Sequence, residues 1–360
     1  MLEWGFEHMF AHWNSAELAD FCIQEIPGFD PAHLNTFINA DTCLDIRQSL
    51  VGSLKYHRLF LVTASTVPSA AFQDIVLALL LPIEVVVRPS ENLVPLFRDL
   101  HQYLTEITPL LAQRLRIVET GHCEDSLIQW MEWCDCINIS GSNTTIEYYK
   151  DLLSQHSLMP KIIPHGHRVS VAVIRSHESD ILTSQDYHHL SLDLTVWDQM
   201  GCLSPKCILI EDNLGQCEKI AQHLSEYLDE WARSLPEGVK ELEVEVQKNS
   251  AVQMAMLDGA KVIRCKKNDD VLVIHSEMSE FEPVFLPRFT HIYPVRDCVE
   301  AAIRLSPYGQ AFGSLSMCGD EITSRLKDAG YNYFCRFGRM QDPPLTWLHD
   351  SVGTLLPLYS

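Results

Sequence analysis

One cysteine lies in a segment that suits a reactive thiol. Cys202 follows Gly201 in the segment 198–205, Asp-Gln-Met-Gly-Cys-Leu-Ser-Pro, and an apolar run begins at Cys207. A glycine-containing loop before a strand favours exposure of a thiol. A partly ionised thiol is a competent nucleophile near neutral pH, so Cys202 is a candidate nucleophile. The alternative is an inert loop cysteine, and the immediate neighbours do not separate the two.

A turn that follows an apolar run ending at Val87 suits a nucleotide. Its residues are Arg88, Pro89, Ser90 and Glu91. Ligands of doubly wound sheets lie beyond the carboxyl ends of the strands. There Glu91 can accept hydrogen bonds from ribose hydroxyls and Arg88 can bind a phosphate. The alternative is that Ser90 caps the next helix and Glu91 favours its positive end. The two interpretations are compatible.

A second turn, 139–146, also joins an expected strand to an expected helix. It contains Gly141, Ser142 and Thr145. Small residues and backbone N–H groups at the start of a helix suit a pyrophosphate. Glycine–serine turns are common, and the Gly-x-Gly-x-x-Gly fingerprint is absent from this segment.

Two clusters have residue types found in metal sites. His165, Gly166 and His167 precede a strand, but no third ligand stands at a telling spacing. Cys134 and Cys136 have one residue between them, which is too few for a zinc knuckle, and no second pair follows. The sequence therefore predicts no metal, and the histidines are interpreted as structural or loop residues.

Composition limits the class of protein. The chain has 360 residues and a formal net charge of −21, which disfavours nucleic acid as a partner. A small anionic ligand remains compatible, because helix N-termini attract anions. The first ten residues lack the pattern of a secretory signal, and polar residues and Pro82 interrupt the most apolar stretch, 70–87. A cytoplasmic protein with no membrane span is predicted, and the 12 cysteines are interpreted as mostly reduced core thiols.

Short apolar runs alternate with amphipathic ones, which predicts an α/β protein with a parallel sheet covered on both faces. Helices are expected over 70–81, through the periodic pattern 93–111 and through 220–231. The expected strands are 59–64, 83–87, 115–119, 136–140, 169–175, 207–211, 261–264, 271–275 and 291–295.

The order and spacing of the candidate segments resemble the aldehyde dehydrogenase superfamily. That superfamily has a Lys-Pro-Ser-Glu turn, a Gly-Ser turn, a Glu-Leu-Gly-Gly segment and a Gln-x-x-Cys loop. The counterparts here are 88–91, 141–142, 165–168 and 199–202.

Within the superfamily, the closest resemblance is to the long-chain acyl-CoA reductases, typified by the fatty-acid reductase of bacterial bioluminescence. Segment 198–205 is similar to their Asp-Gln-x-x-Cys-Ser-Ser-Pro, and Trp347-Leu348-His349-Asp350 to their His-Asp-Gly. The similarity covers about 58–356, and the chain is shorter than most members, chiefly at its N-terminus.

The resemblance implies four parts in an aldehyde dehydrogenase-like fold. These are an N-terminal helical segment (1–57), a doubly wound dinucleotide-binding lobe (58–190), an α/β catalytic lobe (191–335) and a segment returning to the first lobe (336–360). Cofactor-binding residues are then expected at Arg88, Ser90, Glu91, Gly141, Ser142, Thr145 and Gly166.

The activity that the resemblance implies is reduction of an acyl thioester to a fatty aldehyde. Cys202 would attack the thioester, and the bound acyl group would receive hydride from NADPH, with NADH as the alternative. His165 replaces the glutamate that activates water in hydrolytic relatives, which fits a reductase, and could assist deprotonation of the thiol. The expected partners are an acyl-CoA or acyl-carrier protein, an acyl-transferase or acyl-protein synthetase, and further copies of the chain.

Two departures from the family pattern favour other interpretations. Thr66 stands where an asparagine usually donates to the oxyanion, and Pro287-Arg288-Phe289-Thr290 replaces the Glu-x-Phe-Gly-Pro segment that steadies the nicotinamide ribose. One alternative is therefore a catalytically degenerate subunit that holds an acyl chain or joins an acyl-transfer complex. Another is an acyl-phosphate reductase with the same cysteine.

Overall fold

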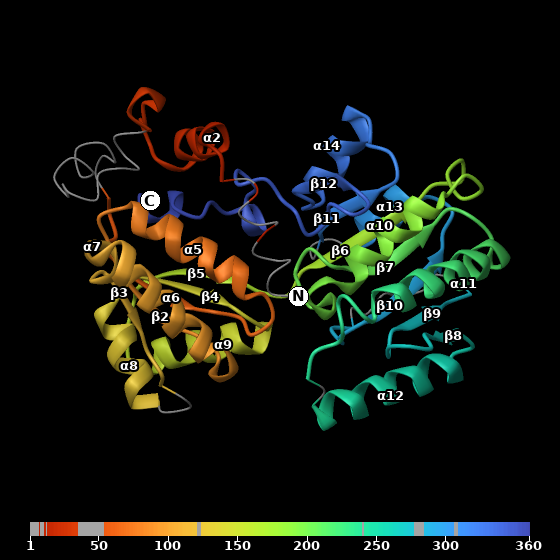
Figure 1. The fold of residues 1–360 in the computed structure, drawn as a ribbon, viewed down its shortest axis with the longest axis horizontal. Helices are drawn as coiled ribbons and strands as arrows, with labels where there is room; N and C mark the ends of the chain where they lie inside the picture. The colour runs from red at the N-terminus through yellow and green to blue at the C-terminus, as the bar shows by residue number, and fades with distance from the viewer. Residues whose placement is uncertain are drawn as a thin grey trace. The chain divides into compact units, whose positions relative to one another are not determined.

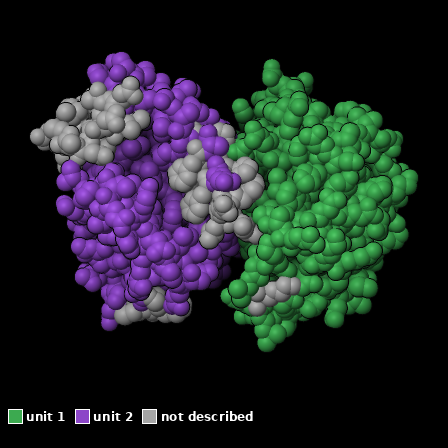
Figure 2. All heavy atoms as spheres, in the orientation of Figure 1, with its two compact units in different colours: residues 1, 168–343 green, residues 2–167, 344–360 purple. Residues whose placement is uncertain are grey.

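The computed structural model describes residues 7, 11, 13–34, 54–120, 124–239, 241–276, 284–305 and 309–360. Contacts divide the chain into two compact units (Figure 2). Unit 1 comprises 168–343, and unit 2 comprises 2–167 and 344–360. The division at residues 167 and 168 differs from the expected boundary after residue 190, which falls inside helix α10 (Ser184–Thr195).

Unit 2 contains a five-stranded, wholly parallel sheet in the order β3-β2-β1-β4-β5 (Figure 1). Its strands are β1 (Arg58–Val62), β2 (Glu84–Arg88), β3 (Leu115–Ile117), β4 (Cys136–Ser140) and β5 (Lys161–His165). Its longer helices are α5 (Pro68–Leu80), α6 (Val94–Ile107), α8 (Glu124–Trp133) and α9 (Asn143–Gln155), with α7 (Pro109–Ala112) after α6.

The strands of unit 2 bury both faces, which explains their continuous apolar runs. Leu59 and Leu61 of β1 lie in a core with α5 and α6, whereas Phe60 and Val62 lie in a core with α8 and α9. Helix α2 (Ser15–Glu25) and the chain's last residues pack into the first core. The described part of unit 2 also contains the 3-10 turns η1 (Pro31–His33), η3 (Glu91–Leu93), η5 (His349–Ser351) and η6 (Leu356–Leu358).

Unit 1 contains a seven-stranded sheet in the order β12-β11-β6-β7-β10-β9-β8, in which only the β8–β9 pair is antiparallel among the described residues. Its strands are β6 (Val169–Ile174), β7 (Pro205–Ile210), β8 (Lys261–Arg264), β9 (Val271–Ile274), β10 (Phe289–Pro294), β11 (Gly309–Ser314) and β12 (Tyr333–Arg336).

Helices cover both faces of this second sheet. Ile208 and Ile210 of β7 pack with α10 and α11 (Leu214–Trp231), whereas Cys207 and Leu209 pack with α13 (Cys298–Arg304) and α14 (Asp320–Asp328). The remaining elements of unit 1 are α12 (Leu242–Leu257) and the 3-10 turn η4 (Val196–Gln199). The α/β class with parallel pairing is therefore confirmed.

The structure differs from the predicted elements at identifiable points. The pattern 93–111 is two helices, because Pro109 disfavours helical backbone at Thr108 and ends α6. Strands β5, β11 and β12 were not predicted. Of the expected helical segment 1–57, residues 1–6, 8–10, 12 and 35–53 lie outside the described part. Among the described helices, none is long and apolar enough to cross a bilayer.

Candidate active site

Four predicted site segments lie at one edge of the unit 2 sheet. Because β1, β2, β4 and β5 are parallel, their carboxyl ends meet at the same edge. Thr66 follows β1, and the other segments are 88–91 after β2, 141–145 after β4 and 165–166 at the end of β5. The structure therefore brings these loops to the edge where α/β sheets bind ligands.

The turn after β2 does not have the local structure expected if Ser90 capped the next helix. The Arg88 Nε donates to Thr120 Oγ1 at 3.3 Å. Ser90 makes no side-chain cap, and its hydroxyl bonds Asn92 Oδ1 at 2.7 Å. The hypothesis that Ser90 caps the long helix through its side chain is wrong, because η3 precedes α6. Glu91 is exposed in that first turn.

The turn after β4 presents a capped helix start. Ser142 caps α9 by accepting from the Thr145 N–H at 3.0 Å, and the two hydroxyls lie 2.9 Å apart. A Cβ on Gly141 would lie 3.2 Å from the Thr145 side chain, so this position favours glycine. The start of α9 therefore directs backbone N–H groups toward the ligand edge of the sheet.

Thr63, which sequence reasoning missed, gives independent support for a ligand at this edge. It follows β1, and its Oγ1 is buried with no hydrogen-bond partner among the described residues. A buried hydroxyl without a partner is costly, so a bound polar group would stabilise it. The edge therefore offers a hydroxyl, a guanidinium, a carboxylate and a helix start, which together fit a dinucleotide. The signal in the sequence was a polar residue at the end of an apolar run.

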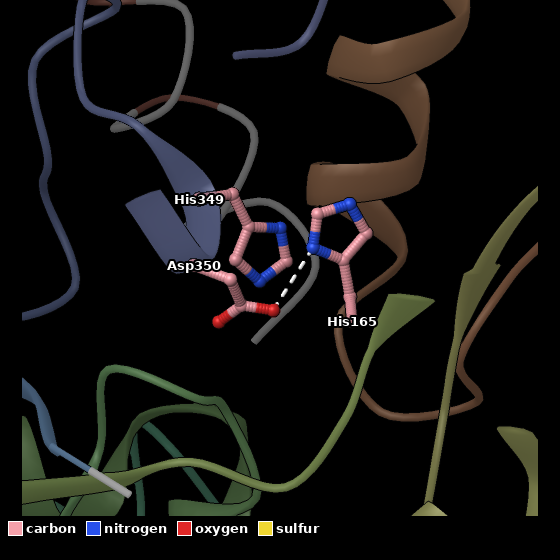
Figure 3. Close-up of side chains that lie close together, drawn as sticks. All are labelled: His165, His349 and Asp350. Carbon is pink, nitrogen blue, oxygen red and sulfur yellow. Dashed lines mark hydrogen bonds and ion pairs between the residues drawn. The ribbon is translucent and has the colours of Figure 1, made fainter. Parts of the chain in front are cut away.

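His165 ends β5, and its ring lies beside Asp350 and His349 (Figure 3). Its Nδ1 lies 3.0 Å from Asp350 Oδ2, and both side chains are almost fully buried. Its ring stacks on His349 with centroids 4.2 Å apart and planes 8° apart. Asp350 has a φ of 53°, a left-handed backbone that orients its carboxylate toward His165. The resemblance had included Asp350 without giving it a role.

Two further observations define the surroundings of His165. Burial raises the pKa of Asp74, on α5, to about 6, and nearby His165 acts in the opposite direction. A Cβ on Gly166 would lie 2.5 Å from Asn143 Oδ1, which accepts from the His167 N–H at 3.0 Å. Gly166 therefore permits close packing of β5 against the start of α9.

The donor atoms of His165, His349 and Asp350 lie within 4.8 Å of one another. Parallel stacked imidazoles point their lone pairs along separate planes, which does not suit a shared ion. The absence of a metal stays a prediction.

Cys202 lies in unit 1, in the turn between η4 and β7. It is half-buried, whereas Cys207 and Cys217 are buried and burial raises the pKa of Cys217 to about 12. The Ser170 hydroxyl donates to the Cys202 carbonyl at 2.7 Å, and the Ser204 N–H donates to the Gly201 carbonyl at 3.1 Å. The turn thus holds its thiol more accessibly than a strand would.

The residues before Cys202 have an unusual backbone. Trp197, Asp198 and Gln199 have φ values of 56°, 51° and 61°, three successive left-handed residues other than glycine. Such conformations cost about 1–3 kcal/mol each and persist where surrounding contacts impose them.

The segment 287–290 supplies several of those contacts. Arg288 Nε donates to Asp198 Oδ1 at 2.8 Å, and the Arg288 N–H donates to the Asp198 carbonyl at 3.0 Å. Gln199 Nε2 donates to Thr290 Oγ1 and to the Pro205 carbonyl, each at 2.7 Å. The segment that was compared with the ribose-binding motif therefore binds the Asp-Gln part of the cysteine loop.

Known structures share this fold. A putative aldehyde dehydrogenase, PutA, from Anabaena variabilis is 16% identical, with a TM-score of 0.66 over 99% of this chain and 82% of that one. A putative aldehyde dehydrogenase from Burkholderia cenocepacia is 15% identical, with a TM-score of 0.66 over 99% and 85%. AldH of Staphylococcus aureus, in a substrate-bound state, is 11% identical, with a TM-score of 0.64 over 100% of this chain and 88% of that one. No curated protein matches the sequence.

The chain thus shares its fold with aldehyde dehydrogenases of known structure. The model of the family described as acyl-CoA reductase (LuxC) matches residues 6–359, and the chain belongs to that family. It is an NAD(P)-dependent oxidoreductase that acts on an acyl substrate, and the resemblance found in the sequence is confirmed.

Proposed function

We propose that the protein reduces an acyl thioester to a fatty aldehyde through an acyl thioester on Cys202. The observation that carries this proposal is the Cys202 turn. Its thiol is half-buried, and contacts from three strands hold the backbone around it. A nucleophile fixed in one geometry loses little entropy when it reacts.

The reaction balances in two stages. The Cys202 thiolate forms a bond to the acyl carbonyl carbon, and the bond to the carrier breaks as the carrier sulfur leaves and takes up a proton. A bound reduced nicotinamide would supply hydride to the carbonyl carbon of the enzyme-held acyl group. The resulting oxyanion collapses, which releases the aldehyde and restores the Cys202 thiolate.

We assign cofactor binding to the carboxyl edge of the unit 2 sheet. Arg88, Ser90, Glu91, Gly141, Ser142, Thr145 and Gly166 would hold the dinucleotide, and Thr63 adds a hydroxyl. The half-buried Arg88 favours NADPH through its 2′-phosphate. Glu91, which is exposed, would prefer the free ribose hydroxyl of NADH, the alternative.

We assign acid–base and oxyanion roles to His165 and Thr66. Asp350 at Nδ1 favours the tautomer with its proton on that nitrogen, so that Nε2 can accept the proton of a thiol. The hydroxyl of Thr66, which is half-buried, would donate to the oxyanion together with the Cys202 N–H. An acyl-carrier protein or an acyl-transferase is the proposed donor of the acyl group.

The test compares wild type, Cys202→Ser and Cys318→Ser, whose native thiol is also half-buried. Each protein is incubated with a long-chain acyl-CoA, with and without NADPH, while NADPH absorbance, aldehyde and intact mass are followed. Acylation and aldehyde formation by wild type and Cys318→Ser, with neither by Cys202→Ser, are expected. Absence of acylation and turnover in wild type would refute the proposal. Acylation without NADPH oxidation would indicate the acyl-holding subunit instead, and acylation by an acyl phosphate alone would indicate an acyl-phosphate reductase.

A further inference from the structure

A lysine with no role in the steps proposed above is buried beside the cysteine turn. Lys206, in β7, is only 2% exposed, although lysine is almost never buried without a compensating partner. Its Nζ donates to the Gln199 carbonyl and lies 6.0 Å from the centroid of the Phe285 ring. A buried ammonium with one carbonyl and one aromatic face has no full countercharge in these contacts.

The backbone directs this side chain. In the β6–β7 pairing Ser170 is opposite Pro205 and Val171 is opposite Cys207, so Lys206 is the extra residue of a β-bulge. A bulge turns a side chain away from the regular alternation of the strand, and bulges occur often next to active sites. Here the bulge lies beside Ser170, whose hydroxyl holds the Cys202 carbonyl.

Lys206 therefore interacts with two residues of the Cys202 turn, Gln199 and Cys202. The ammonium binds the carbonyl of Gln199, the last of the three left-handed residues. Cys202 itself precedes Lys206 by four residues, and its thiolate and the Lys206 ammonium interact electrostatically.

We propose that Lys206 is a positioning residue that fixes the Gln199 carbonyl under the Cys202 turn and, through its positive charge, favours the thiolate form of Cys202. The proposal deepens the proposed function, on which it rests for the role of Cys202 as nucleophile.

The charges around Lys206 agree with this role. Burial lowers the pKa of Lys206 to about 7, and a thiolate at Cys202 opposes this lowering, so each charge favours the other. Strand β6 has no ionisable side chain. On β10, burial lowers the pKa of His291 to about 3, so this histidine is uncharged at neutral pH. Burial raises the pKa of Tyr293, and Asp198 is paired with Arg288. Cys202 is therefore the group whose ionisation Lys206 affects most directly.

The test measures the ionisation of Cys202 without substrate or cofactor. The rate of alkylation by iodoacetamide is followed from about pH 5 to about pH 10, and the modified cysteine is identified by peptide mass. Wild type is compared with Lys206→Gln, which retains a hydrogen-bond donor without the charge, and with Lys206→Met, which retains neither. Cys318 is the internal reference, since its charged neighbours are Arg175 and Glu178.

Both variants are expected to alkylate Cys202 about tenfold more slowly than wild type at neutral pH and at nearly the same rate at high pH, because removal of an adjacent positive charge raises a thiol pKa by about one unit or more. Unchanged pH profiles in folded variants would overturn the proposal. Restoration of the wild-type profile by glutamine alone would overturn its electrostatic part.

Folding of each variant is checked by circular dichroism. If neither folds, the wild-type profile decides: ionisation of Cys202 at or above the ordinary thiol value of about 8.5 would overturn the proposal, and a lower value would support it. If wild type makes no aldehyde while the variants show an altered alkylation profile, the proposed function is refuted and the effect of Lys206 on the ionisation of Cys202 stands.

Discussion

The hydrogen bond between His165 and Asp350 determines which imidazole nitrogen is available for chemistry. With the proton of the neutral ring held at Nδ1, Nε2 is an acceptor, as a base requires. The stacked His349 ring limits rotation of the imidazole. In a catalytic triad, an aspartate orients the histidine that acts as the base. Asp350 and His165 have the same arrangement.

Substitution Asp350→Asn tests this role at the scale of one residue. Asparagine tolerates the left-handed backbone at this position, but its amide can donate to Nδ1 and would then favour the opposite tautomer. We expect kcat for aldehyde formation to fall by about 100-fold or more, as for loss of a general base. Asp342→Asn is the matched control, because Asp342 is equally buried but pairs with Arg339. Equal activity of both variants would contradict the role of Asp350.

At the scale of elements, the cysteine loop depends on a contact between distant segments. Arg288 is fully buried and bonds Asp198 and the Leu235 carbonyl, while Asp270 lies 3.6 Å from its guanidinium. Burial raises the pKa of Asp270 to about 7, although Arg288 acts in the opposite direction. The loop is therefore held in its left-handed conformation by a buried ion pair at the start of β10.

Replacement of Arg288 by methionine should destabilise the protein strongly. Removal of one partner of a buried pair leaves an uncompensated charge, so we expect the free energy of unfolding to fall by about 3–5 kcal/mol. Urea denaturation followed by circular dichroism measures this change. Arg325→Met removes an exposed pair with Glu300 and should cost no more than about 1 kcal/mol. Similar losses in both variants would argue against the Arg288 contact.

The sequence predicted local elements well and distant contacts poorly. Nine strands were expected at places where strands lie, because their apolar runs are local signals. Strand β5 was missed because its burial pattern is broken by polar ends and Pro164. The cysteine loop was found from its motif, but Arg288 and Lys206 were not found as its supports. Their contacts depend on strand pairing and a bulge, which no local pattern encodes.

At the scale of the molecule, a buried carboxyl group makes the stability of the fold depend on pH. Asp193 is buried in α10 and accepts from the Gly338 N–H at 2.6 Å and the Met340 N–H at 3.1 Å. Burial raises its pKa from 3.8 to about 8, although the two N–H groups oppose the change. The folded protein therefore retains a proton that the unfolded chain releases at much lower pH.

This proton makes stability depend on pH in a defined direction. Because the folded-state pKa is raised, its contribution is full at low pH and is lost as the pH rises toward 8. We expect the free energy of unfolding to fall between about pH 5 and about pH 8, by up to about 1.4 kcal/mol per pH unit for this proton. Asp193→Asn should reduce the slope of that decline in urea denaturation. An identical slope in the variant would show that Asp193 does not carry the proton.

The return of the chain to unit 2 has a consequence for biosynthesis. His165 and Asp350 are 185 residues apart, and Leu355 and Leu358 complete the core that contains α2 and β1. On the ribosome, residues 168–343 can emerge and fold as unit 1 before unit 2 acquires its final segment. A nascent chain that stops before residue 350 would display Cys202 but lack the aspartate that orients His165. Translation of the segment 344–360 is thus the step that supplies the second half of the proposed acid–base pair.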